Sequence, residues 1–150
     1  VSRNSAQGTV GTNAIALGKN AGAGQTSQNS GAIAIGWGAG ATSQGNQAVA
    51  IGVNAGKACG SNSVAIGLET NFTAGEGNTV AIGTRAGRNY QKGHGIAIGQ
   101  HAGYQDQKGI AIGHLAGETN QSSNAVAYGN HAGKYINKQL ISIVYILGTL

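Results

Sequence analysis

Four carboxylates, four histidines and one cysteine are the groups in this 150-residue chain that could perform acid–base, metal or nucleophilic chemistry. Hydrolysis of a glycosidic bond needs two carboxyl groups about 5 to 10 Å apart across a cleft, and Glu69 and Glu76 are the nearest pair in the sequence. The sequence contains no dinucleotide-binding or phosphate-binding glycine motif, no His-Glu-x-x-His and no cysteine pair. The groups are Glu69, Glu76, Asp106, Glu118, His94, His101, His114, His131 and Cys59, the last expected to be an unreactive thiol.

A cluster of cationic and aromatic side chains between Arg85 and His114 is the one local enrichment suited to binding. The chain carries a net charge of +5, but its basic residues are otherwise scattered and form no run of the kind that binds nucleic acid. Within the cluster only Asp106 opposes the positive charge, which suits an acidic glycan or a matrix protein; an ordinary solvated surface is the alternative. The candidate ligand-binding residues are Arg85, Arg88, Tyr90, Lys92, His101, Tyr104, Lys108 and His114, with His94 in the same segment.

An internal repeat determines which elements carry these residues. The word Ile/Val-Ala-Ile/Leu/Tyr-Gly occurs eight times, and an Ala-Gly pair usually follows each copy; the fourth copy departs from this pattern after Gly67. Glycine makes up 28 of the 150 residues, proline is absent and aromatic residues are only 5%, so a conventional globular core is not expected. The words end at Gly18, Gly36, Gly52, Gly67, Gly83, Gly99, Gly113 and Gly129, which gives repeats of 14 to 18 residues.

Each word is predicted to be a short strand, because side chains alternate between the two faces of a strand and both faces are apolar here. A period near sixteen is too short for helical repeats and fits one rung of a β-solenoid, with Ser, Thr, Asn, Gln and Gly in its turns. The fold class is therefore all-β: a parallel β-roll or β-helix of about eight repeats. Its inner face is expected to hold the large side chains, such as Ile33 and Ile35, and its outer face the alanines, such as Ala34.

A rod of this kind is predicted to associate with its own copies. Eight rungs would leave a continuous apolar alanine strip in water, which soluble monomers avoid. Three chains around one axis would bury all the strips equally, so a homotrimer is expected; a monomeric solenoid whose turns cover the second face is the alternative. A convex rod offers no cleft for Glu69 and Glu76, and His101 and His131 would lie two rungs apart, too far for a shared zinc ion. We expect no enzyme activity, no cofactor and no metal site.

The repeated words NQAVAIG (residues 46–52), NSVAIG (62–67) and NTVAIG (78–83) resemble the head repeats of trimeric autotransporter adhesins, the YadA-like heads. The resemblance extends from Asn13 to about Gly133. It implies a left-handed parallel β-roll, a homotrimer, and display on a bacterial cell surface for attachment to host matrix or cells. Similar repeats occur in viral and phage fibre proteins, which makes the shaft of a receptor-binding fibre the alternative. The family repeat is nearer fourteen residues, and its coiled-coil stalk and membrane-anchoring barrel have no counterpart here.

The C-terminal end of the sequence breaks the period. Residues 1–133 are assigned to the repeats, and residues 134–150 to a cap or to the start of a further domain. The longest apolar run, residues 140–147, is far shorter than the roughly 20 residues of a membrane-spanning helix, so no membrane span is expected in this segment.

Overall fold

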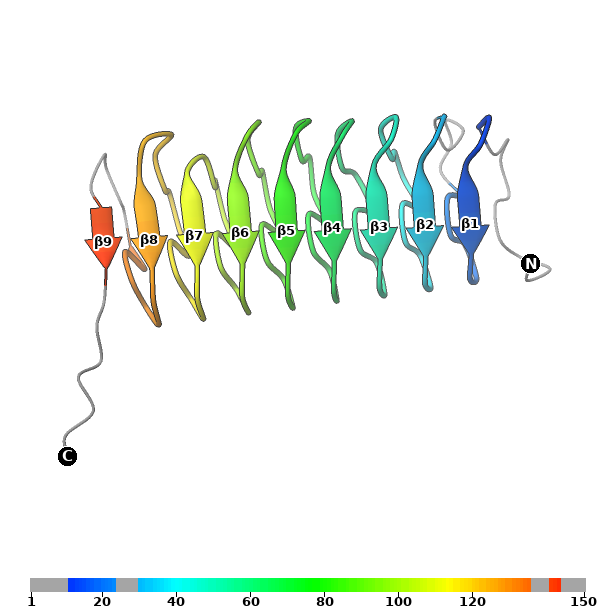
Figure 1. The fold of residues 1–150 in the computed structure, drawn as a ribbon. Helices are drawn as coiled ribbons and strands as arrows, with labels where there is room; N and C mark the ends of the chain where they lie inside the picture. Colours follow the sequence, from blue (N-terminus) through cyan, green and yellow to red (C-terminus); the bar gives the residue numbers. More distant parts are fainter. Residues whose placement is uncertain (1–10, 24–29, 136–140, 144–150) are drawn as a thin grey trace.

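The computed structural model describes residues 11–23 and 30–135 and the backbone of residues 141–143. Its strands form a single nine-stranded parallel sheet in which each strand pairs with the next one in the sequence (Figure 1). The predicted all-β solenoid of short repeats is confirmed. The strands are β1 (Ile15–Leu17), β2 (Ile33–Ile35), β3 (Val49–Ile51), β4 (Val64–Ile66), β5 (Val80–Ile82), β6 (Ile96–Ile98), β7 (Ile110–Ile112), β8 (Val126–Tyr128) and β9 (Ile141–Ile143).

Successive strands pair in register, so equivalent residues of neighbouring repeats form continuous columns. Ala97 of β6, for example, lies between Ala81 of β5 and Ala111 of β7. Parallel strands lie about 4.8 Å apart, so nine of them give a sheet about 40 Å long. Residues at the same position of neighbouring repeats therefore lie side by side. This arrangement decides which residues can form a site.

The prediction that isoleucine and valine fill the interior is wrong. The central alanine of each strand from β2 to β8 is completely buried, whereas the first and third side chains are intermediate or exposed, as with Ile82 at 36% and Tyr128 at 56%. The interior alanines of the strands pack against those of the Ala-Gly pairs, such as Ala97 and Ala102 in one cluster. Between a strand and the Ala-Gly segment opposite it, the rung has room only for methyl groups, so the isoleucine and valine side chains of the strands lie outside.

Glutamine completes the interior, which the sequence analysis missed. Gln107 is fully buried, and its Nε2 donates to the carbonyl oxygens of Ile96 at 3.0 Å and Gly109 at 2.6 Å. Its side chain lies against Gly103, where an added Cβ would come within 2.8 Å of Gln107 Oε1. The two hydrogen bonds from Nε2 satisfy both N–H groups of the amide and offset part of the cost of its burial, whereas Gln107 Oε1 has no hydrogen-bond partner among the described residues. The recurring Gly-x-x-x-Gln spacing is the signal for this arrangement, at Gln44, Gln91, Gln107 and Gln121.

The irregular fourth repeat keeps a polar interior with different residues. Asn71 stands where other repeats have the glycine of the Ala-Gly pair, and its Nδ2 donates to Thr79 Oγ1 at 2.9 Å. The Thr79 hydroxyl bonds in turn to Ser63 Oγ at 3.0 Å. All three side chains are completely buried. This network replaces the glutamine amide and explains why the pattern changes after Gly67.

The end of the chain adds one more strand to the sheet. β9 pairs in parallel with β8, with Val126 opposite Ile141. Most of the predicted cap, residues 136–140 and 144–150, lies outside the described residues, so its role stays a prediction. In the part of the chain that the structure describes, no helix is long and apolar enough to cross a membrane.

Candidate functional site

A ladder of stacked cations and aromatic rings runs along one column of the solenoid. Its members follow the strand glycine by five residues in four successive repeats, so the register places them side by side. Lys57 Nζ lies 4.9 Å from the centre of the Phe72 ring, and the Arg88 guanidinium lies 4.9 Å from the same centre. Arg88 also lies 5.8 Å from the Tyr104 ring. We call Lys57, Phe72, Arg88 and Tyr104 the cation–aromatic ladder; contacts of this kind contribute about 0.5 to 1 kcal/mol each at exposed sites.

Glu69 forms ion pairs with the ladder residue Arg88 and with Arg85 beside it. Its Oε2 accepts from Arg85 Nε at 3.0 Å and from Arg88 Nε at 3.1 Å. Partial desolvation acts to raise the pKa of Glu69, but hydrogen bonds and charge from Arg88 and Arg85 outweigh it and hold the pKa below its ordinary value. Two cations therefore share one carboxylate, and the group keeps an excess of positive charge.

The sequence analysis considered only His101 and His131 as a pair of histidines, whereas the structure shows other ring contacts. His101 stacks on Tyr104 with ring centres 5.3 Å apart, and desolvation followed by the nearby Arg85 lowers the pKa of His101. His114 and His131 meet edge to face with ring centres 5.4 Å apart, a contact between neighbouring rungs that the sequence analysis did not identify. In the described residues, no group of three or more His, Cys, Asp or Glu side chains is arranged to hold a metal ion.

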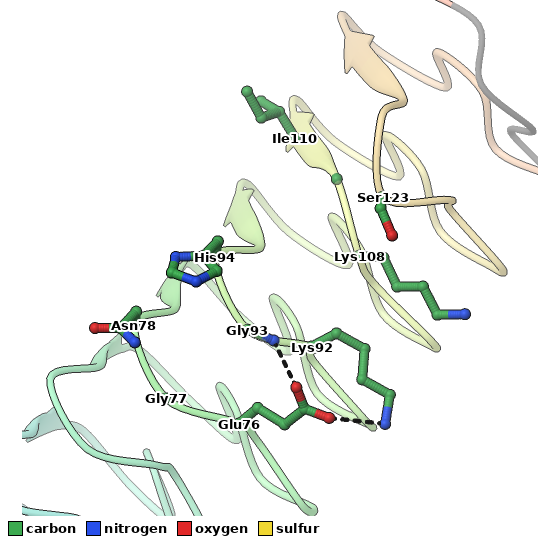
Figure 2. A pocket seen from close by; sticks show the side chains of 10 residues that line it. Glu76, Gly77, Asn78, Lys92, Gly93, His94, Lys108, Ile110 and Ser123 are labelled. Atoms are coloured by element: carbon green, nitrogen blue, oxygen red, sulfur yellow. Dashed lines mark hydrogen bonds and ion pairs between the residues drawn. The ribbon is translucent and has the colours of Figure 1, made fainter.

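A second group of the predicted residues lines an open hollow at the turns that precede the strands (Figure 2). Its volume is about 890 Å³. Lys92 Nζ contacts Glu76 Oε1 at 3.0 Å, and the Gly93 amide donates to Glu76 Oε2 at 3.0 Å. These two donors and the Lys92 charge place the pKa of Glu76 below its ordinary value. We call this hollow the notch; residues 76–78, 92–94, 108–110 and Ser123 line it.

The structure thus divides the predicted binding residues. Arg85, Arg88, His101 and Tyr104 come together at the ladder. Lys92 and Lys108 line the notch, together with His94. Tyr90 is 48% exposed, and His114 Nδ1 lies 3.1 Å from Asn130 Oδ1. Sequence analysis missed Lys57 and Phe72, which share the ladder column with Arg88 and could have been found by aligning the repeats.

Three of the four carboxylates in the chain, for which no catalytic role was expected, form ion pairs with lysine or arginine. Besides Glu69 and Glu76, Glu118 Oε2 lies 3.6 Å from Lys134 Nζ. Each carboxylate pairs with a cation of another repeat, between 15 and 20 residues along the chain. Their arrangement links adjacent rungs, and exposed pairs of this type are worth about 0 to 1 kcal/mol.

Cys59 is expected to resist alkylation in the folded protein. Its side chain is 3% exposed, and burial raises the pKa of the thiol to about 11, although a backbone hydrogen bond from Gly45 opposes the shift. The thiolate is the reactive form, so iodoacetamide at pH 8 should modify native Cys59 about 100-fold or more slowly than the unfolded chain, a two-unit shift in pKa being a hundredfold. Mass spectrometry of a labelling time course, with and without guanidinium chloride, measures this. Equal rates would contradict the burial of Cys59.

Comparison of the chain with protein-family models, with curated proteins and with solved structures gives no match. The resemblance to YadA-like heads and to viral fibres therefore rests on the repeated words and stays a prediction.

Proposed function

We propose that this chain is a non-enzymatic segment of a surface-displayed homotrimeric adhesin head that attaches a bacterial cell to host matrix, cells or glycans. The left-handed winding implied by the resemblance belongs to the same proposal. The alternative is the structural shaft of a viral or phage receptor-binding fibre, in which the repeats set a distance and another region binds. Both place the chain outside the cell.

The observation that carries the proposal is the outward apolar face of the sheet. Each strand from β1 to β8 presents its first and third side chains on this face, and all of them are Ile, Val, Leu or Tyr. Beneath them lie alanine methyl groups, the Cys59 thiol and buried amide and hydroxyl side chains, so the largest apolar side chains of the repeats face outward. The strip formed by these eight strands is continuous over about 34 Å, and soluble monomers rarely expose large contiguous apolar patches. Packing against identical strips removes it from water, and closed symmetry does so for every copy.

The surface residues support attachment rather than catalysis. The ladder and its flanking arginines form a regular array on a rigid, register-locked scaffold, with Arg85 and Arg88 sharing only Glu69. In a trimer each array would occur three times, and simultaneous contacts convert weak single-site binding into avidity. This favours an attachment surface for acidic partners.

Loss of Arg85 and of the ladder residue Arg88 is expected to weaken attachment. Arg85→Gln with Arg88→Gln should lower binding of the purified protein to matrix-coated plates and to cells at least tenfold, because each copy in the trimer loses two cations. Lys19→Gln with Lys134→Gln removes the same charge from the two ends of the solenoid and should leave binding within about twofold. Circular dichroism and thermal unfolding of both variants check that the fold is kept.

Two results would count against these ideas. If the parent protein binds no matrix, cell or glycan surface, the attachment function is wrong and the fibre-shaft alternative is favoured. If the parent binds and the variant that lacks Arg85 and Arg88 binds equally well, attachment does not depend on these two arginines.

A further inference from the structure

The notch exists because one rung is two residues shorter than its neighbours. Four residues, Lys-Gly-His-Gly, separate Gln91 from β6, whereas only Lys108 and Gly109 separate Gln107 from β7. Four residues again separate Gln121 from β8. The turn leading into β7 is visibly shorter than those leading into β5 and β6 (Figure 1). Since all other contacts keep the register, the missing residues leave a hollow between longer turns.

The walls of the notch carry one more positive than negative side chain among Glu76, Lys92 and Lys108. Lys108 is exposed and has no ion-pair partner among the described residues, while Lys92 is shared with Glu76. One positive charge therefore remains uncompensated. Figure 2 shows Lys92 and Lys108 extending from adjacent turns along the hollow, with Ser123 on the far side.

A backbone donor is also available there. Two residues before the strand, the N–H of Asn62 donates to Asn46 O and that of Asn78 to Ser61 O in the previous turn, both at 2.9 Å. In the described part of the chain the His94 N–H has no such backbone acceptor. A polar group that finds no partner in the protein is available to a ligand or to water.

The shape suits a small, flat, hydroxyl-bearing molecule. Gly77 and Gly93 occupy equivalent positions of two successive turns, three residues before β5 and β6, so neither position carries a side chain that covers the backbone there. The amide of Asn78 adds a donor and an acceptor. A volume of about 890 Å³ falls within the roughly 300 to 1,000 Å³ of small-molecule sites.

We propose that the notch formed by the short rung before β7 binds an acidic saccharide, with Lys108 and Lys92 contacting its anionic group. The hydroxyls of the sugar bond to Asn78, Ser123 and the glycine backbone. This inference rests on the proposed function, because it names the class of ligand that the attachment segment would bind. A single site of this openness is expected to bind weakly, with a Kd on the order of 1 mM.

The decisive variant fills the notch. Inserting His-Gly between Gly109 and Ile110 gives the short rung the same turn sequence as the rung before it, Lys-Gly-His-Gly, which the solenoid already accommodates. A panel of uronate-, sialate- and sulfate-bearing oligosaccharides, each with a neutral counterpart, is tested at physiological salt against the full chain. The parent should prefer acidic members, and the insertion should reduce that binding at least tenfold.

Lys108→Gln provides an independent variant that cannot disturb the backbone, and Lys19→Gln is its matched control. Lys108→Gln should also lower binding at least tenfold, whereas Lys19→Gln should bind like the parent. If the parent does not discriminate acidic from neutral sugars, or if the insertion and Lys108→Gln both bind like the parent, the notch is not the site. If the parent protein still attaches to cells or matrix after one of these results, the proposed function stands and only this inference is overturned.

Discussion

Gly99→Ala is expected to destabilise the protein by more than about 3 kcal/mol, a large share of the roughly 5 to 15 kcal/mol that holds a typical domain folded. Gly99 ends β6 with φ at 125°, a conformation that is essentially confined to glycine. A Cβ on Gly99 would also lie 2.5 Å from the carbonyl oxygen of Gly113 in the next rung. That neighbour is backbone and cannot rotate away, so the two rungs would have to separate.

The separation would break further bonds. The Gly99 N–H donates to Ile82 O and the Gly113 N–H to Ile98 O, both at 2.8 Å, and these bonds join consecutive rungs at this corner. Chemical denaturation at one fixed protein concentration measures the effect, because the stability of an oligomer depends on concentration. The denaturant concentration at the unfolding midpoint should be clearly lower for Gly99→Ala than for the parent protein.

Gly93→Ala is the matched control for Gly99→Ala. An added Cβ there would meet its nearest neighbours, Glu76 Oε2 and Gly77 O, at 3.5 Å, an ordinary van der Waals contact. Its stability should stay within about 1 kcal/mol of the parent, with a small gain possible through a less flexible unfolded chain. If both variants lose the same stability, close stacking of the strand-end glycines is not what limits these positions.

Ile98→Glu is expected to abolish self-association while leaving the solenoid folded. Ile98 is the third residue of β6 and belongs to the outward apolar face, so its replacement disturbs no interior contact. In a symmetric trimer three such carboxylates would be taken out of water, at a cost of several kcal/mol per ion. Light scattering of the parent should give about three times the chain mass of 14.8 kDa, and of the variant about that mass itself.

Gln105→Glu adds the same charge to the same rung at an exposed position away from the apolar face. It should stay trimeric. Circular dichroism should show the β-signal of the parent in both variants. A parent protein that is monomeric at micromolar concentration, or an Ile98→Glu variant that remains trimeric, would contradict assembly through this face.

The repeat itself made much of the architecture predictable. Eight words with glycine at constant phase predict short strands, a parallel sheet and in-register columns, because a chain that repeats its pattern repeats its local conformation. The columns in turn bring Arg85, Arg88 and Tyr104 together, as the cluster between Arg85 and His114 indicated.

What the sequence could not determine was the side of the strand that faces inward. Alternation places Ile98 and Ala97 on opposite faces but assigns neither face to the interior. The usual preference for burying the larger apolar residue gave the wrong answer, because the thickness of a rung depends on how closely two backbone segments approach. Between the strand and the Ala-Gly segment that distance admits alanine and excludes isoleucine and valine. The notch has the same origin: a two-residue shortening is visible in the sequence, but only the stacking of unshortened turns on both sides makes it a hollow.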